Sequence, residues 1–169
     1  MSDAHIRWAI KSDSAQVLEI ERQSFSILES WNDEDFAVAL RKNSVMMVAE
    51  LPDESIGGFL VYEGMRFRMD VLNLAVAESN RRQGIAAKLI DKLKSKLSFD
   101  KRRTIRVDVL DDNLAAHLFY RSQGFVAVDV MGACLDDADH DAYRFECRCD
   151  SEDIDRATAR FKTASRQGK

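Results

Sequence analysis

The feature that most constrains the fold is a buried strand that runs into a helix through a short cationic loop. Residues 71–76, Val-Leu-Asn-Leu-Ala-Val, are apolar on both faces, which is typical of a central strand covered on both sides. From residue 85 onward, apolar residues recur at helical spacing on one face: Ile85, Leu89, Ile90, Leu93 and Leu97. Between them lies Arg-Arg-Gln-Gly-Ile-Ala-Ala, residues 81–87. A buried strand joined to an amphipathic helix requires layers of helix against sheet.

The remaining pattern predicts short strands and helices in alternation. The predicted strands cover residues 6–10, 45–51, 56–63, 69–76, 105–109, 125–130 and 143–149. The predicted helices run from about residue 12 to 25, from 32–35 onward, from 85, from 111–113 to 122, and over 151–161. The order β-α-α-β-β-β-α-β-α-β-β-α predicts an α/β fold with a mixed sheet flanked by helices. We expect one domain over residues 1–150 and a helical tail over 151–169.

Composition narrows the classes of partner. The 169 residues carry 25 basic and 29 acidic side chains, a formal charge of −4, and nucleic-acid binders are usually basic. No apolar run approaches the ~18–20 residues of a membrane span, and the first residues contain no secretory apolar segment. The three cysteines, an odd number, favour a reducing compartment. We therefore expect a cytoplasmic protein that binds neither nucleic acid nor membrane.

Two stretches could suggest a metal site, and neither has a complete ligand set. Cys147-x-Cys149 has no second Cys or His pair to complete a zinc site. Asp137, Asp139 and Asp141 begin like a calcium loop, but Ala142 stands where that loop requires glycine, and its twelfth position, 148, is arginine rather than glutamate. We predict no metal.

The loop at residues 81–87 has two interpretations. It matches neither a Walker A loop nor a dinucleotide fingerprint, because it contains a single glycine. A tight turn before a helix nevertheless directs unpaired N–H groups outward, and the helix dipole adds positive potential. Gly84 and Ala86 allow close approach, and Arg81 and Arg82 add charge. The loop is either a pyrophosphate site or a charged turn that opens a surface helix.

A second block, residues 113–125, reads Asn-Leu-Ala-Ala-His-Leu-Phe-Tyr-Arg-Ser-Gln-Gly-Phe. Together the two blocks resemble the GNAT superfamily of acyl-CoA-dependent N-acetyltransferases. The loop matches the family's R/Q-x-x-G-x-G/A motif, the second block matches N-x-x-A-x-x-L/F-Y-x-x-x-G-F, and Asn73-Leu-Ala-Val76 stands where the family has its cofactor strand. The resemblance covers residues 5–149 and is strongest to the ribosomal-protein-alanine N-acetyltransferases and their protein N-terminal relatives. The chain departs from many relatives in lacking a proline at 77–79 and in having Asp rather than Glu at 108.

The resemblance implies a mostly antiparallel central sheet and acetyl-CoA as co-substrate. It implies that the CoA pyrophosphate lies on the loop amides and that the pantetheine arm pairs with the neighbouring strand. The cofactor-binding residues are then Leu74, Ala75, Val76, Arg81, Arg82, Gln83, Gly84, Ile85, Ala86, Ala87 and Asn113. Asn113 is also a suitable helix N-cap, so its role stays open between cap and cofactor contact.

The resemblance also implies a direct attack of an amine on the thioester, with Asp108 as proton acceptor and Tyr120 as proton donor to the departing thiolate. A solvated carboxylate and a core tyrosine are the structural alternatives, and His117 is expected to be a surface residue. The expected acceptor is a protein or peptide N-terminal amine. A small-molecule amine and a CoA-binding regulatory module without turnover stay open, as does the choice between monomer and homodimer. Residues 24–31 are the expected acceptor wall, and the acidic loop 136–141 could border the acceptor.

Overall fold

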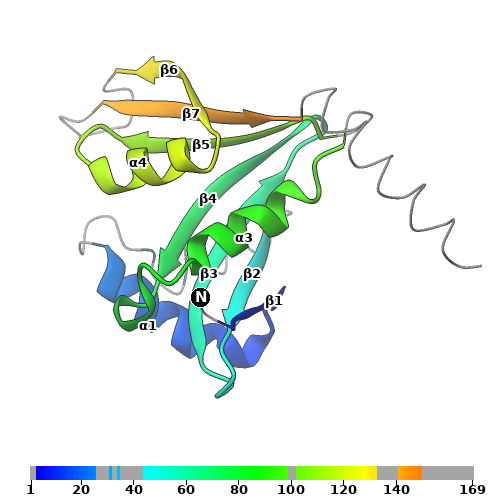
Figure 1. Ribbon diagram of the computed structural model, residues 1–169, viewed down its shortest axis with the longest axis vertical. Helices are drawn as coiled ribbons and strands as arrows, with labels where there is room; N and C mark the ends of the chain where they lie inside the picture. The colour runs from blue at the N-terminus through cyan, green and yellow to red at the C-terminus, as the bar shows by residue number, and fades with distance from the viewer. Residues whose placement is uncertain are drawn as a thin grey trace, which may run out of the picture. The chain divides into compact units, whose positions relative to one another are not determined.

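The computed structural model describes residues 3–25, 31, 34, 44–98, 102–132 and 141–149. The chain forms two compact units (Figure 1). The first unit comprises Met1–Met65 and Met69–Ser95, and the second comprises Arg66–Arg68 and Lys96–Lys169. Each unit is described separately below.

The first unit is an antiparallel sheet with helices packed on it. Its strands are β1 (His5–Trp8), β2 (Ser44–Glu50), β3 (Ile56–Gly64) and β4 (Arg68–Val76), and each pairs antiparallel with the next. Its helices are η1 (Lys11–Asp13), α1 (Ser14–Ser24), η2 (Glu78–Asn80) and α3 (Ile85–Lys94). The turn at Pro52–Ser55 joins β2 and β3, with Leu51 N–H donating to Ser55 O at 2.8 Å.

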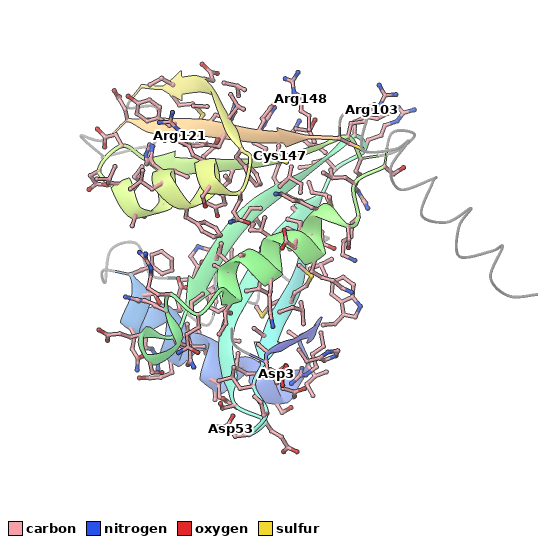
Figure 2. The ribbon with its side chains drawn as sticks, in the orientation of Figure 1. Asp3, Asp53, Arg103, Arg121, Cys147 and Arg148 are labelled. Carbon is pink, nitrogen blue, oxygen red and sulfur yellow. The ribbon has the colours of Figure 1, made fainter. Side chains whose placement is uncertain are left out.

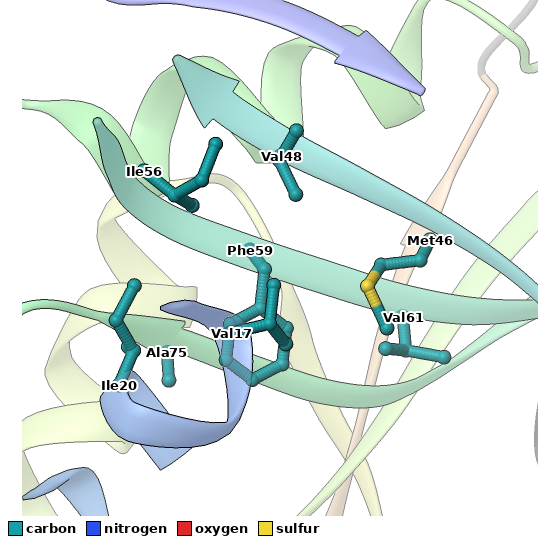
Figure 3. Close-up of a cluster of buried hydrophobic side chains, with 8 residues drawn as sticks. All are labelled: Val17, Ile20, Met46, Val48, Ile56, Phe59, Val61 and Ala75. Atoms are coloured by element: carbon teal, nitrogen blue, oxygen red, sulfur yellow. The ribbon is translucent and has the colours of Figure 1, made fainter. Parts of the chain in front are cut away.

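One face of this sheet packs against α1. Val17 and Ile20 of α1 meet side chains from three strands in a buried cluster (Figure 3). The strand members are Met46, Val48, Ile56, Phe59, Val61 and Ala75. Each fully buried aliphatic side chain contributes on the order of 2 kcal/mol. This cluster therefore holds α1 against β3 and β4.

α3 packs on the unit through the apolar stripe that the sequence predicts. Ile85, Leu89, Ile90 and Leu93 are all buried, whereas Leu97 lies beyond the end of the helix at Lys94. A Cβ added to Gly58 would lie 2.9 Å from Ala75 O and 3.1 Å from Ile85 Cγ2. The start of α3 therefore packs closely on β3, which fixes the position of the loop that precedes the helix.

The second unit contains β5 (Thr104–Leu110), α4 (Leu114–Ser122), β6 (Val126–Met131) and β7 (Ala142–Arg148). β7 lies between β5 and β6 and is antiparallel to both (Figure 1). Val107 and Val109 are buried and Asp108 is exposed, which is the alternation of a strand with one face covered. Gly124, with φ of 77°, follows the last turn of α4 and ends it.

The predicted fold class is confirmed as a mixed α/β fold in which every strand pairing within the two units is antiparallel. The helix predicted from 32–35 and the tail predicted over 151–169 lie outside the described residues, apart from Glu34. The single domain over 1–150 stays a prediction. In the described part of the chain, no helix combines the length and apolar character needed to span a bilayer.

Candidate functional site

β4 carries a bulge just before the stretch that was assigned to the cofactor. Val61 pairs with Asn73, but its neighbour Tyr62 pairs with Val71, so Leu72 is an extra residue in β4. A bulge twists a strand and redirects the residues beside it, and bulges are frequent next to functional sites. Leu74, Ala75 and Val76 follow the bulge and pair with β3 up to the end of the strand.

The loop after β4 has an unusual backbone. Arg82 has φ of 63° and Gly84 has φ of 85°, both in the left-handed region. This conformation suits glycine but is uncommon for arginine, where it costs about 1 kcal/mol or more. Alternation of ordinary and left-handed residues gathers successive N–H groups into a concave nest that binds anions.

The amides of this loop are available to a ligand. Within the residues that the structure describes, the N–H groups of residues 82–87 have no recorded acceptor, and the first helical hydrogen bond to the loop runs from Lys88 N to Gly84 O at 3.0 Å. Gly84 is exposed, and a Cβ placed on it would meet nothing within 4 Å. Free amides, open space and the N-terminus of a ten-residue helix together form a site suited to a phosphate group.

The side chains of Arg81 and Gln83 donate hydrogen bonds to main-chain carbonyl groups that precede the turn. Arg81 Nε donates to Val76 O at 3.2 Å, so its guanidinium turns back onto the end of β4. Gln83 Nε2 donates to Ser79 O at 3.1 Å. Both contacts brace the turn. The roles of residues 74–76 and 81–87 toward a cofactor remain predictions.

In the second unit, Asn113 caps α4. Its Oδ1 accepts a hydrogen bond from Ala116 N at 3.0 Å, the geometry of an N-cap. The structural interpretation of Asn113 is therefore confirmed. A cofactor contact through the remaining amide nitrogen stays a prediction.

Tyr120 is a buried phenol in the last turn of α4. It is 5% exposed and packs edge-on against Phe119 and Phe125, with ring centroids 5.2 and 5.3 Å away. Burial raises the pKa of Tyr120, so the phenol stays protonated across the neutral range. No hydrogen bond of its hydroxyl is recorded to any described residue. A protonated hydroxyl without a partner among the described residues is available to a ligand.

Asp108 lies on the exposed face of β5 in a two-point ion pair. Arg144 on β7 donates from Nε to Asp108 Oδ1 at 2.8 Å and from Nη2 to Oδ2 at 2.9 Å. The register of the two strands places these residues directly opposite each other. A proton acceptor at Asp108 would therefore work with Arg144 already bound to both oxygens, a partner that the sequence reasoning missed.

His117 differs from the prediction of a surface histidine. It is half-buried, its Nε2 donates to Leu110 O at 2.8 Å, and its ring packs edge-on against Tyr143 and Phe145. The helix is close enough to β7 for these aromatic contacts, which hydropathy of a single residue does not reveal. These contacts give His117 a structural role in holding α4 on β7.

The described residues of the expected acceptor wall pack inward. Phe25 and Trp31 are half-buried against the α1 cluster rather than exposed. Residues 26–30 and the acidic loop at 136–140 lie outside the described residues. In the parts of the chain that are described, no group of three or more metal-ligating side chains occurs.

Sequence reasoning also missed a buried polar cluster in the first unit. Glu21 of α1 is fully buried and accepts hydrogen bonds from Asn73 of β4 and from Trp31 N. The signal was present, because Glu21 stands four residues after Val17 on the apolar face of its helix.

Comparison with known proteins decides the family. Residues 42–127, half of the chain, match the family described as the acetyltransferase (GNAT) domain. The chain belongs to this family. The predicted resemblance is thereby confirmed, and with it the class of acyl-CoA-dependent N-acetyltransferase and acetyl-CoA as co-substrate of this GNAT domain.

Solved structures share the fold of this GNAT chain. The ribosomal-protein-S18-alanine N-acetyltransferase of Escherichia coli is 20% identical, with a TM-score of 0.75 over 86% of this chain and 93% of its own. Ard1 from Thermoplasma volcanium is 25% identical, with a TM-score of 0.75 over 88% and 99% of the two chains. NAA60 of Arabidopsis thaliana in complex with acetyl-CoA is 22% identical, with a TM-score of 0.74 over 86% and 99%. A search of curated proteins by sequence found no match.

Proposed function

We propose that this GNAT domain transfers acetyl from acetyl-CoA to the N-terminal amine of a protein or peptide. The observation that carries the donor half is the run of free main-chain N–H groups at residues 82–87. The acceptor class is supported by likeness of the sequence motifs to protein N-terminal acetyltransferases and by the shared fold with the E. coli ribosomal-protein enzyme.

The loop residues would hold the donor by its diphosphate. The six N–H groups of this short turn are free to donate to phosphate oxygens, and the dipole of α3 favours the negative charge. Acetyl-CoA supplies an activated acyl thioester. In our proposal the backbone of Leu74, Ala75 and Val76 orients the arm that carries it, and a strand N–H polarises the acyl oxygen.

The acceptor must lose a proton before it attacks. An α-amine, with an ordinary pKa of about 7.7–8.0, does so far more readily than a lysine at about 10.4, which favours an N-terminal acceptor. We propose that Asp108 receives this proton, directly or through water. The pairing with Arg144 holds the carboxylate in one orientation, and each oxygen retains a lone pair for the incoming proton.

Tyr120 is proposed to donate a proton, or a strong hydrogen bond, to the departing thiolate. The residue fits because it remains protonated at neutral pH and because its hydroxyl has no acceptor among the described residues. The aromatic contacts with Phe119 and Phe125 fix its ring. A fixed, protonated donor favours developing negative charge on sulfur.

The proposal also covers the cellular location and the oligomeric state of the protein. The sequence has three cysteines, an odd number, which is consistent with a reducing compartment, and we propose the cytoplasm. Monomer and homodimer are both compatible with the proposal.

The test is a measurement of CoA release from acetyl-CoA over a panel of acceptors. The panel contains free-amino tripeptides, the same peptides N-acetylated, spermidine and glucosamine. We expect turnover with free-amino peptides and none with the blocked forms. Preference for spermidine or glucosamine would contradict the peptide acceptor, and binding of acetyl-CoA without release by any amine would favour a regulatory module.

A further inference from the structure

Glu21 and Asn73 form a buried polar pair between α1 and β4. Glu21 is 0% exposed near the end of α1, and Asn73 is 8% exposed on β4. Asn73 Nδ2 donates to both carboxylate oxygens at 3.1 Å, and Trp31 N donates to Glu21 Oε1 at 2.8 Å. No cation pairs with Glu21 among the described residues. Buried charges are normally paired, so this one calls for an explanation.

The pair also has more acceptors than donors. Asn73 Oδ1 is buried and has no hydrogen-bond partner in the described part of the chain. Beside it stands a carboxylate, which can only accept while it is ionised. Among the described residues, the cluster therefore has neither a positive charge nor further N–H donors.

A neutral amide at position 21 would satisfy the same space. Glutamine has nearly the shape of glutamate, and its Nε2 could donate to Asn73 Oδ1 once the asparagine amide turns over. Its Oε1 could still accept from Asn73 Nδ2 and Trp31 N. Every polar atom of the cluster would then be paired without a buried charge, so the demands of folding favour glutamine over glutamate.

The position of the pair suggests what the charge does. Asn73 directly follows the β4 bulge and is followed by Leu74, Ala75 and Val76, the strand proposed to orient the acyl arm. Three strand residues span about 10 Å. Through its hydrogen bonds to Asn73 and Trp31, the carboxylate places negative charge beside the strand that presents the acyl group. A protonated primary amine bound beside this strand would supply the positive charge.

We propose that Glu21 is a positioning residue for the acceptor, and that its buried charge, presented at β4 through Asn73, selects a protonated primary amine over a neutral acceptor. This inference rests on the acetyl transfer proposed above. Glu21 does not itself contact the acceptor, because its side chain is fully buried. Its effect is electrostatic, and two unit charges about 10 Å apart at a partly screened site change affinity by about tenfold.

The experiment compares the full-length chain with its Glu21→Gln variant. Glu19→Gln is the matched control, because Glu19 lies on the exposed face of the same helix and removes the same formal charge. Steady-state acetylation of the tripeptide amide Ala-Gly-Ser is measured together with unfolding in urea. We expect the KM for peptide to rise about tenfold in Glu21→Gln while the KM for acetyl-CoA stays within about twofold, with no loss of stability. Glu19→Gln should behave like the parent.

A binding titration without acetyl-CoA separates this inference from the proposed function. NMR titration with Ala-Gly-Ser amide and its N-acetylated form should show binding of the free amine only, weakened about tenfold in Glu21→Gln. If the parent binds the free amine in this way but releases no CoA, acetyl transfer fails and the role of Glu21 stands. Equal peptide binding or equal peptide KM in parent and variant would overturn the role of Glu21, as would a parent that does not distinguish the two peptides. A Glu21→Gln chain that fails to fold would overturn it too, because the carboxylate would then be structural.

Discussion

Glu21 of α1 and Glu146 of β7 are both buried carboxylates, and their surroundings differ in one respect. Glu21 accepts hydrogen bonds from an asparagine and a backbone amide, whereas Glu146 accepts them from Arg106 and Arg148 at 2.9 Å each. Burial raises the pKa of Glu21, and the two hydrogen-bonding groups only partly oppose it. Burial acts in the same direction on Glu146, but the two arginines outweigh it and lower the pKa. One of these two arginines, Arg148, is the last residue of β7 and directly follows Cys147 (Figure 2).

The same contrast extends through the two units. The first unit leaves the loop amides of 82–87 and Asn73 Oδ1 without partners in the described residues, while in the second unit the carboxylates of Asp108 and Glu146 are paired with arginines. Polar groups that the chain itself satisfies stabilise the fold, and exposed groups left unsatisfied are available to ligands. In the second unit, Tyr120 is the residue that departs from this pattern.

The largest effect on catalysis should come from changing Tyr120. Tyr120→Phe removes the unpartnered hydroxyl but keeps the ring and its contacts, so we expect kcat to fall about 100-fold with little change in stability. Tyr143→Phe, which alters a tyrosine that packs on His117, is the control and should retain kcat within about twofold. Stopped-flow or thiol-release kinetics measure both. Turnover of Tyr120→Phe at the parent rate would remove Tyr120 from the mechanism.

The paired carboxylate should matter for stability and not for binding. Glu146→Gln leaves Arg106 and Arg148 without their shared charge, and because Arg148 is largely exposed we expect a loss of about 2 kcal/mol in the free energy of unfolding. Glu21→Gln should instead leave stability unchanged or raise it by about 1 kcal/mol. Urea unfolding of the two variants checks the opposite signs. A similar loss in both would abolish the contrast between the two carboxylates.

Two glycines, one in each unit, allow the same comparison to be made with backbone changes. Gly84 and Gly124 are both exposed and left-handed, with open space where a Cβ would stand, so alanine should strain both by about 1 kcal/mol. Only Gly84 belongs to the proposed anion loop, and we expect Gly84→Ala to weaken acetyl-CoA binding about tenfold, as measured by calorimetry. Gly124→Ala should lose the same stability and keep its affinity. Equal affinity for acetyl-CoA in the two variants would show that the loop does not bind the donor.

The smallest effect should appear in the dependence of stability on pH. The unfolded chain protonates both glutamates near pH 4.3. Because the folded pKa of Glu146 is lowered, its stabilisation is present above that pH and is lost as pH falls through the folded value. Because the folded pKa of Glu21 is raised, its destabilisation develops as pH rises from about 4.3 through the folded value. As the pH rises above about 4.3, the advantage of Glu21→Gln should therefore grow until the folded pKa of Glu21 is passed, while the deficit of Glu146→Gln stays constant. If the free energies of unfolding of the two variants change with pH in parallel, the pKa values of Glu21 and Glu146 do not shift in opposite directions.

The sequence could predict those parts of the molecule that follow from periodicity and local chemistry. Alternation around Asp108, the apolar stripe from Ile85 to Leu93 and the stop at Gly124 are all local signals, and the structure confirms them. Partners distant in sequence were not predictable in this way. The Arg144 that binds Asp108 depends on the register between β5 and β7, and neither side chain carries a signal of the other.

The candidate site likewise has features that the sequence predicts and features that it does not. The glycine loop could be predicted because a turn before a helix needs particular residue types. The left-handed backbone at Arg82 could not, because arginine gives no propensity signal for it. Asn73 lay within the predicted cofactor strand, but its hydrogen bonds to Glu21, 52 residues away, became evident only from the packing of α1 on β4.

The central claim is that the main-chain amides of residues 82–87 bind the diphosphate of the donor. Amide NMR of the labelled full chain, titrated separately with CoA and with pantetheine, tests it most directly, because pantetheine retains the arm and lacks the diphosphate. The account predicts that CoA shifts the amide signals of residues 82–87 and that pantetheine leaves them unchanged. Saturation with CoA while these six signals stay in place and others move would contradict it.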